Sequence, residues 1–154
     1  MRVQRKYVGV VLVLALLSGS MAQTACSPTD VSKVKKKVAD AAAILNTAAK
    51  SNRSLYQSGV YGAVGSPDAI KKRQEVATAI HQANEFLSMA VEQAANLTAA
   101  DLAGGKQAIA ALLTKAVQVL QTVHVANQNI ELILTSAVTA INAAITLTLA
   151  IKGT

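Results

Sequence analysis

Apolar side chains recur at intervals of three and four residues from Val31 to Leu55, which is the spacing of one face of an α-helix. The alternation of three and four is typical of the line along which packed helices touch. Asn52 is the one polar member of this line, and we predict that it biases the register between helices. The line consists of Val31, Val34, Val38, Ala41, Leu45, Ala48, Asn52 and Leu55.

A second helix is predicted from "SPDA", which begins at Ser66, because serine caps helices and proline suits the first helical position. "SPTD" from Ser27 predicts the same kind of start for the first helix. The glycine-rich stretch between them, 58–67, lacks the preceding strand of a phosphate-binding loop and is interpreted as an interhelix loop. The predicted contact stripe of the second helix is Ile70, Ala77, Ile80, Asn84, Leu87, Val91 and Ala94.

A further break is predicted at "NLTAADLAGG", where Thr98 and Asp101 have capping-box spacing and Gly104 and Gly105 interrupt the helical pattern. From Lys106 to Ile151 there is neither glycine nor proline, and one polar stripe keeps its helical phase throughout. We therefore favour a single helix here, about 68 Å long at 1.5 Å per residue. The alternative is a turn near Asn127. The stripe contains Gln121, His124, Gln128, Glu131, Thr135, Thr139, Asn142 and Thr146.

The predicted fold is therefore all-α: an up-and-down helical bundle of three long helices after an N-terminal signal helix. The alternative split of the last helix gives four. The 154 residues suffice for one domain with a real core, and 52% of them are apolar but only 3% aromatic. The core must then consist of Ala, Val, Ile and Leu, and alanine lets helices approach closely.

The first residues have the three parts of a secretory signal: basic "MRVQRK", apolar "VGVVLVLALL" and small, polar "SGSMAQTAC". Ten apolar residues fall short of the roughly 20 that span a bilayer. We assign residues 1–25 to a signal peptide and residues 26–154 to the bundle domain. Ser20 and Ala22 also permit an ordinary cleavage that leaves Gln23 first, and an uncleaved anchor is a third alternative.

"QTAC", residues 23–26, resembles the lipobox of bacterial lipoproteins, in which the cysteine is lipidated and becomes the new N-terminus. The resemblance covers only this signal and implies an acyl anchor at Cys26. Cys26 is the only cysteine of the chain, and an unpaired thiol in an exported protein calls for a partner or a modification. We expect an exported, membrane-anchored lipoprotein of the cell envelope, with a secreted or periplasmic soluble protein as the alternative.

A lysine run follows the cysteine at a distance suited to anionic lipid headgroups, and such a run reinforces an acyl anchor. The competing interpretation is a solvated helix face, since Asp40 lies at pairing distance from Lys36 and Lys37, and we weigh it slightly higher. The run comprises Lys33, Lys35, Lys36 and Lys37.

Charge and motif content exclude several functions. The net charge is +7, but the leader holds Arg2, Arg5 and Lys6, so only +4 remains without it. With few aromatics to stack on bases and no DNA-reading motif, we expect no nucleic-acid partner. Metal, cofactor and catalysis are likewise not expected, because His81, Glu85 and His124 are scattered and match no ligand motif.

The sequence thus predicts a non-enzymatic envelope scaffold or interaction module, held to membrane lipid by an acyl anchor, with a protein partner or self-association. The alternative is a membrane-active protein that inserts residues 132–151, a stretch of twenty without a charge. Six of the twenty are polar, and the polar stripe runs through them. We therefore expect this helix to pack within the bundle through Leu134, Ala137, Val138, Ile141 and Ile145.

Overall fold

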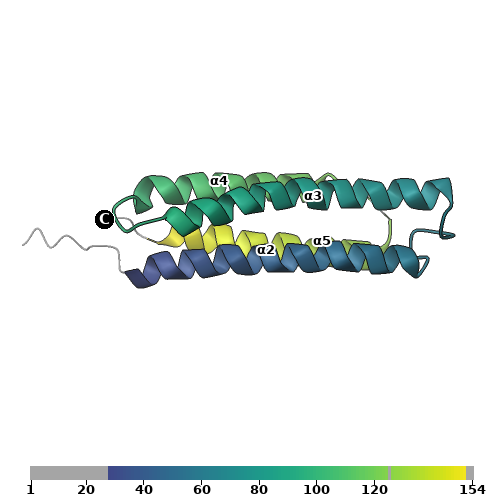
Figure 1. The fold of residues 1–154 in the computed structure, drawn as a ribbon, viewed down its shortest axis with the longest axis horizontal. Helices are drawn as coiled ribbons and strands as arrows, with labels where there is room; N and C mark the ends of the chain where they lie inside the picture. Colours follow the sequence, from purple (N-terminus) through teal and green to yellow (C-terminus); the bar gives the residue numbers. More distant parts are fainter. Residues whose placement is uncertain (1–27, 125, 152–154) are drawn as a thin grey trace, which may run out of the picture.

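The computed structural model describes residues 28–124 and 126–151, which form helices and no strand. The helices are α2 (Pro28–Gln57), α3 (Pro67–Asn96), α4 (Leu102–Gln121) and α5 (Gln128–Ala150). Figure 1 shows them running alternately up and down along one long axis. Each helix contacts the helices before and after it, and α5 closes the ring against α2. The predicted all-α, up-and-down bundle is confirmed, while the signal segment 1–25 and Ser27 lie outside the described residues.

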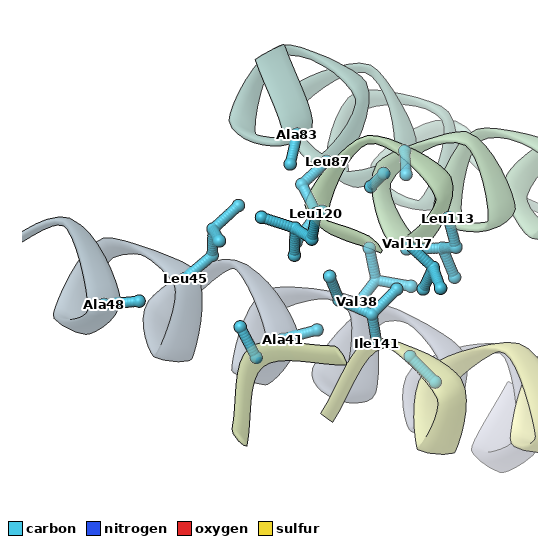
Figure 2. Close-up of a cluster of buried hydrophobic side chains, with 14 of the residues drawn as sticks. Val38, Ala41, Leu45, Ala48, Ala83, Leu87, Leu113, Val117, Leu120 and Ile141 are labelled. Atoms are coloured by element: carbon cyan, nitrogen blue, oxygen red, sulfur yellow. The ribbon is translucent and has the colours of Figure 1, made fainter. Parts of the chain in front are cut away.

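The contact line predicted along the first helix is the buried face of α2. Its first seven members, from Val31 to Asn52, are buried, and Leu55 is half-buried against the core. Figure 2 shows Val38 and Leu45 of this line pointing toward side chains of the other helices. The core consists of aliphatic residues with many alanines, and this lets the helix backbones lie close together.

The stripe predicted for the second helix is correct at Ile80, Leu87 and Ala94, which are buried, and is not correct at its other members. Ile70 is exposed, and Ala77 and Val91 are only half-buried. Apolar residues flank both sides of the true contact line, so periodicity alone does not fix the helix rotation; packing against α2 and α4 does. The face that α3 buries is Ala69, Val76, Ala79, Ile80, Ala83, Leu87, Ala90 and Ala94.

The single helix favoured for residues 106–151 is wrong, and the alternative split near Asn127 is correct. Helix α4 ends at Gln121, and Asn127 caps α5 by accepting hydrogen bonds from the N–H groups of Asn129 and Ile130, at 3.0 and 3.4 Å. The turn lets α5 fold back and bury its apolar face against α2 and α4. Every member of the predicted polar stripe is exposed, so the stripe is the solvent face of both segments.

Two other predicted boundaries have different outcomes. Ser66 caps α3 as expected, because its side chain accepts a hydrogen bond from the N–H of Ala69 at 3.3 Å, with Pro67 in the first turn. Thr98 and Asp101 do hydrogen-bond to each other, in the turn before α4. Gly104 and Gly105 do not interrupt a helix, however, since α4 begins at Leu102 and contains both.

The interhelix loop after α2 is confirmed and makes a tight reversal. Gly62 has φ +122°, a backbone conformation that side-chain-bearing residues rarely adopt, so glycine is required there. Tyr61 beside it is buried. Asn127 donates a hydrogen bond to the carbonyl of Val60 at 3.4 Å, which ties this loop to the α4–α5 turn at the same end of the bundle.

Candidate functional site

The predicted lysine run lies in the first turns of α2, and its members differ in what they contact. Lys36 and Lys37 are exposed, and so is Lys33, which forms an ion pair with Asp30 at 3.0 Å. Among the described residues, Asp40 pairs with neither Lys36 nor Lys37. We call Lys33, Lys36 and Lys37 the lysine surface: they share the solvent side of α2, away from the buried line through Val34 and Val38.

Lys35 has a structural role that the sequence interpretation did not foresee. Its ammonium donates a hydrogen bond at 2.8 Å to the carbonyl of Ala95, in the last turn of α3. Lys106 of α4 makes a matching bond of 2.8 Å to the carbonyl of Ile151, the residue that caps α5. No described helix has a basic residue in its own last turn, so these lysines of neighbouring helices supply positive charge at two negative helix ends.

Cys26, the predicted lipidation residue, lies outside the described residues. It precedes Pro28, the first residue of α2, by two positions in the chain. The ends of α3 and α5 lie beside the start of α2 at one end of the molecule (Figure 1). The lysine surface and the two lysine-capped helix ends therefore lie at the same end of the bundle.

The second basic cluster, Lys71 to Arg73, lies at the start of α3. Because α2 and α3 run antiparallel, it lies at the opposite end of the bundle from the lysine surface (Figure 1). These two basic clusters therefore do not join into one continuous patch.

The three residues weighed as metal ligands are not brought together. His81 and Glu85 form a contact of 3.4 Å between Nε2 and Oε1 on the exposed side of α3. His124 lies in the turn after α4 and lines two surface hollows, neither of which is lined by His81 or Glu85. Within the described part of the chain, no group of three His, Cys, Asp or Glu side chains is placed to hold a metal ion.

A polar cluster between α2 and α3 was missed by sequence reasoning. The hydroxyl of buried Tyr61 donates a hydrogen bond to Oδ1 of buried Asn52, and Arg73 lies near this tyrosine. Burial raises the pKa of Tyr61 to about 12, although the positive charge of Arg73 opposes the rise. The guanidinium of Arg73 stacks over the Tyr56 ring, 5.0 Å from the ring centroid. The one sequence signal was Asn52, a polar residue in an apolar line.

Helix α5 is long and apolar enough to cross a membrane, the one described helix of which this holds. In the bundle it packs against α2 and α4 through Leu134, Ala137 and Ile141, which are buried as predicted. The other two predicted residues, Val138 and Ile145, are only half-buried against the core. Leu132 and Leu149 remain exposed, at 66% and 43%. A mainly apolar hollow of about 550 Å³ separates the end of α4 from the start of α5 and is lined in part by Leu120, Leu134 and Val138.

Searches for related proteins found no match among protein-family models, curated proteins or solved structures.

Proposed function

We propose that this protein is a non-enzymatic scaffold or interaction module of the cell envelope, anchored to membrane lipid through an acyl group on Cys26. The observation that carries the proposal is the lysine surface, which points to solvent in the first turns of α2, seven to eleven residues after Cys26 in the chain. The rigid four-helix body then stands next to the anchor and presents its remaining surface to a partner.

An acyl anchor and a basic surface act together physically. A single acyl chain gives marginal, reversible binding to a membrane, and stable anchoring takes a second signal. Exposed lysines close to the anchor supply that signal on an anionic membrane, where each adds a favourable electrostatic term. Lys36 and Lys37 meet this requirement and have no competing partner among the residues that the structure describes, and Lys33 is exposed but also pairs with Asp30. Lys35 instead donates to the carbonyl of Ala95 and stabilises the bundle.

Mass spectrometry of the mature N-terminus tests the anchor directly. The full chain is expressed in a bacterial host, recovered from membranes and digested, and the expected N-terminal peptide begins at acylated Cys26. Cys26→Ala should release the protein from the membrane fraction. A free N-terminus at Gln23 with an unmodified thiol would contradict lipidation and leave simple secretion.

Binding of the lipidated protein to vesicles tests the lysine surface. Replacing Lys33, Lys36 and Lys37 together by Gln should weaken binding to anionic vesicles by about tenfold to a hundredfold, with little effect on neutral vesicles. The matched control replaces Lys50, Lys71 and Lys72 by Gln, which removes the same charge from exposed positions elsewhere. Equal losses in the two triple variants would mean that net charge, and not this surface, governs binding.

The alternative function is membrane activity through insertion of α5, and the length and apolar character of that helix favour it. Against it, α5 already buries one side in the bundle, including Leu134, Ala137 and Ile141. Its solvent side carries Glu131, Thr135 and Asn142, which gain nothing from lipid. We therefore propose that α5 functions as a packed helix of the bundle and does not insert into the membrane.

A further inference from the structure

A hollow of about 210 Å³ lies between the second half of α2 and the first half of α3. Side chains with hydrogen-bond donors line most of it, and among the described residues its lining includes no carboxylate. The volume is below the range of about 300 to 1,000 Å³ typical of drug-sized ligands, so it suits a small ion with some water. The polar lining residues are Asn46, Asn52, Arg53, Arg73, His81 and Asn84.

Arg73 is the unusual member of this lining. Its side chain is half-buried, and its Nε is fully shielded from solvent yet has no hydrogen-bond partner. Among the described residues, no ion pair includes it. Shielding a cation and one of its donors without a counter-charge is costly. Stacking over the Tyr56 ring holds one face of the guanidinium in place but supplies no hydrogen-bond acceptor.

The hollow is also held in a defined shape. The Tyr61 hydroxyl donates a hydrogen bond to Oδ1 of Asn52 and so fixes the orientation of this buried amide. The N–H groups of the amide are left as donors for another partner. Arg53 lines the same hollow from α2, one residue further along. Two positively charged residues, Arg53 and Arg73, thus line one hollow, and a negative ion between them would reduce their mutual repulsion.

From these observations we infer that the hollow between α2 and α3 is a binding site for a small oxyanion, held by Arg73 and Arg53 with help from Asn52 and Asn84. A guanidinium presents paired N–H donors that match two oxygens of one carboxylate, phosphate or sulfate group. An oxyanion in the hollow would neutralise the local positive charge and accept hydrogen bonds from the terminal guanidinium N–H groups of the arginines. The asparagines add neutral hydrogen bonds around it.

Calorimetric titration of the full chain in non-ionic detergent tests this site. The protein is prepared in a buffer without oxyanions and titrated at constant ionic strength with inorganic phosphate, sulfate or acetate. Saturable 1:1 binding of at least one is expected. Arg73→Gln and Arg53→Gln should each weaken it by about tenfold or more, the value of one charge-assisted hydrogen bond. Vesicles with and without phosphatidylglycerol are titrated in parallel.

The matched control is Lys50→Gln, which removes one positive charge from an exposed position of α2 outside the hollow and should change affinity by less than about twofold. Arg53 is exposed, so Arg53→Gln decides the matter if Arg73→Gln fails to fold by circular dichroism. A response to phosphatidylglycerol vesicles alone, lost in Arg53→Gln, supports the site and assigns the oxyanion to a lipid headgroup. No saturable binding, or equal weakening by Lys50→Gln, overturns the inference.

Discussion

At the scale of single residues, the pair formed by Asn52 and Tyr61 stands out because both are buried and polar in an otherwise aliphatic interior. The tyrosine hydroxyl donates a hydrogen bond to the asparagine carbonyl oxygen, so the buried donor and the buried acceptor each have a partner. The asparagine lies on α2 and the tyrosine in the following loop, and the hydrogen bond therefore fixes how the loop returns over the helix. This agrees with a role for Asn52 in setting register, which remains a prediction.

Tyr61→Phe should lower the free energy of unfolding at pH 7 by about 1 to 2 kcal/mol, because it leaves the buried carbonyl oxygen of Asn52 without its donor. The deficit should shrink at high pH. The folded pKa of Tyr61 is about 12, against 10.0 for the ordinary side chain, so the unfolded chain loses its phenolic proton first. In the wild type, the contribution of Tyr61 to the free energy of unfolding is therefore fully present below pH 10 and is lost as the pH rises toward 12.

Urea unfolding of both proteins at a series of pH values measures the effect. The difference in unfolding free energy should be constant from pH 7 to pH 9 and narrow above pH 10, where only the wild type carries this titrating group. A difference that stays constant up to pH 12 would mean that the phenol is not shielded as the structure shows.

At the scale of elements, the start of α4 contains two adjacent glycines in different surroundings. A Cβ at Gly104 would meet nothing within 4 Å, whereas a Cβ at Gly105 would collide with Cδ1 of Leu97. Leu97 is buried, so it has little freedom to move aside. Close packing of the α3–α4 turn on the helix therefore explains Gly105, and no contact in the structure explains Gly104.

Gly104→Ala should stabilise the protein by about 0.5 to 1 kcal/mol, because alanine loses less backbone entropy in a helix. Gly105→Ala gains the same propensity but must displace Leu97, so it should be neutral or destabilising. Thermal unfolding of the two variants side by side gives the comparison. Equal stabilisation by both would show that Leu97 does not pack over Gly105.

One substitution in the turn between α4 and α5 tests the split helix, because the split and the continuous helix predict stability changes of opposite sign. Asn127→Ala removes the cap of α5 and the hydrogen bond to Val60, and we expect a loss of about 1 kcal/mol. If residues 106–151 formed one continuous helix, the same change would replace a poor helix former by the best one and increase stability. Chemical denaturation of wild type and variant distinguishes the two results.

At the scale of the whole molecule, the bundle decides how the most apolar helix behaves. Alone, α5 has the length and composition of a membrane span, yet in the fold Leu134, Ala137 and Ile141 are buried against α2 and α4. Leaving the bundle would expose the apolar faces of both partners as well as its own. The gain from insertion is small per residue, about 0.3 to 0.6 kcal/mol for each central Leu or Ile, and the polar stripe reduces it.

Residues 27–154, expressed without the leader, should therefore be soluble and leave dye-loaded anionic vesicles intact. Leu132→Gln serves as a control for surface attachment, because it removes the most exposed apolar side chain of α5 and leaves the packed face unchanged. Concentration-dependent self-association suppressed by Leu132→Gln would locate a contact between copies on this face. Partition into vesicles with dye release would overturn the scaffold proposal in favour of membrane activity.

The sequence by itself determined the features that depend on local spacing. The contact line of α2, the Ser66 cap and the glycine loop follow from which residue types can occupy a helical face, a first turn or a positive φ, and these are properties of short segments. The exposed lysines of the first turns belong to the same class, because a charged run between buried valines must face water.

Tertiary structure alone decided what depends on competition between segments. The rotation of α3 was ambiguous from its own residues and was settled by two neighbouring helices at once. The polar stripe through Gln128 has the spacing of one helix although it crosses a turn, because it lies on the solvent side of the end of α4 and then of α5. The packing of α5 against α2, which requires the chain to reverse, is not visible in that spacing. Likewise, Arg73 of α3 lines the same hollow as Asn52 of α2 and lies near Tyr61 only in the folded bundle, since these residues are separated in the chain.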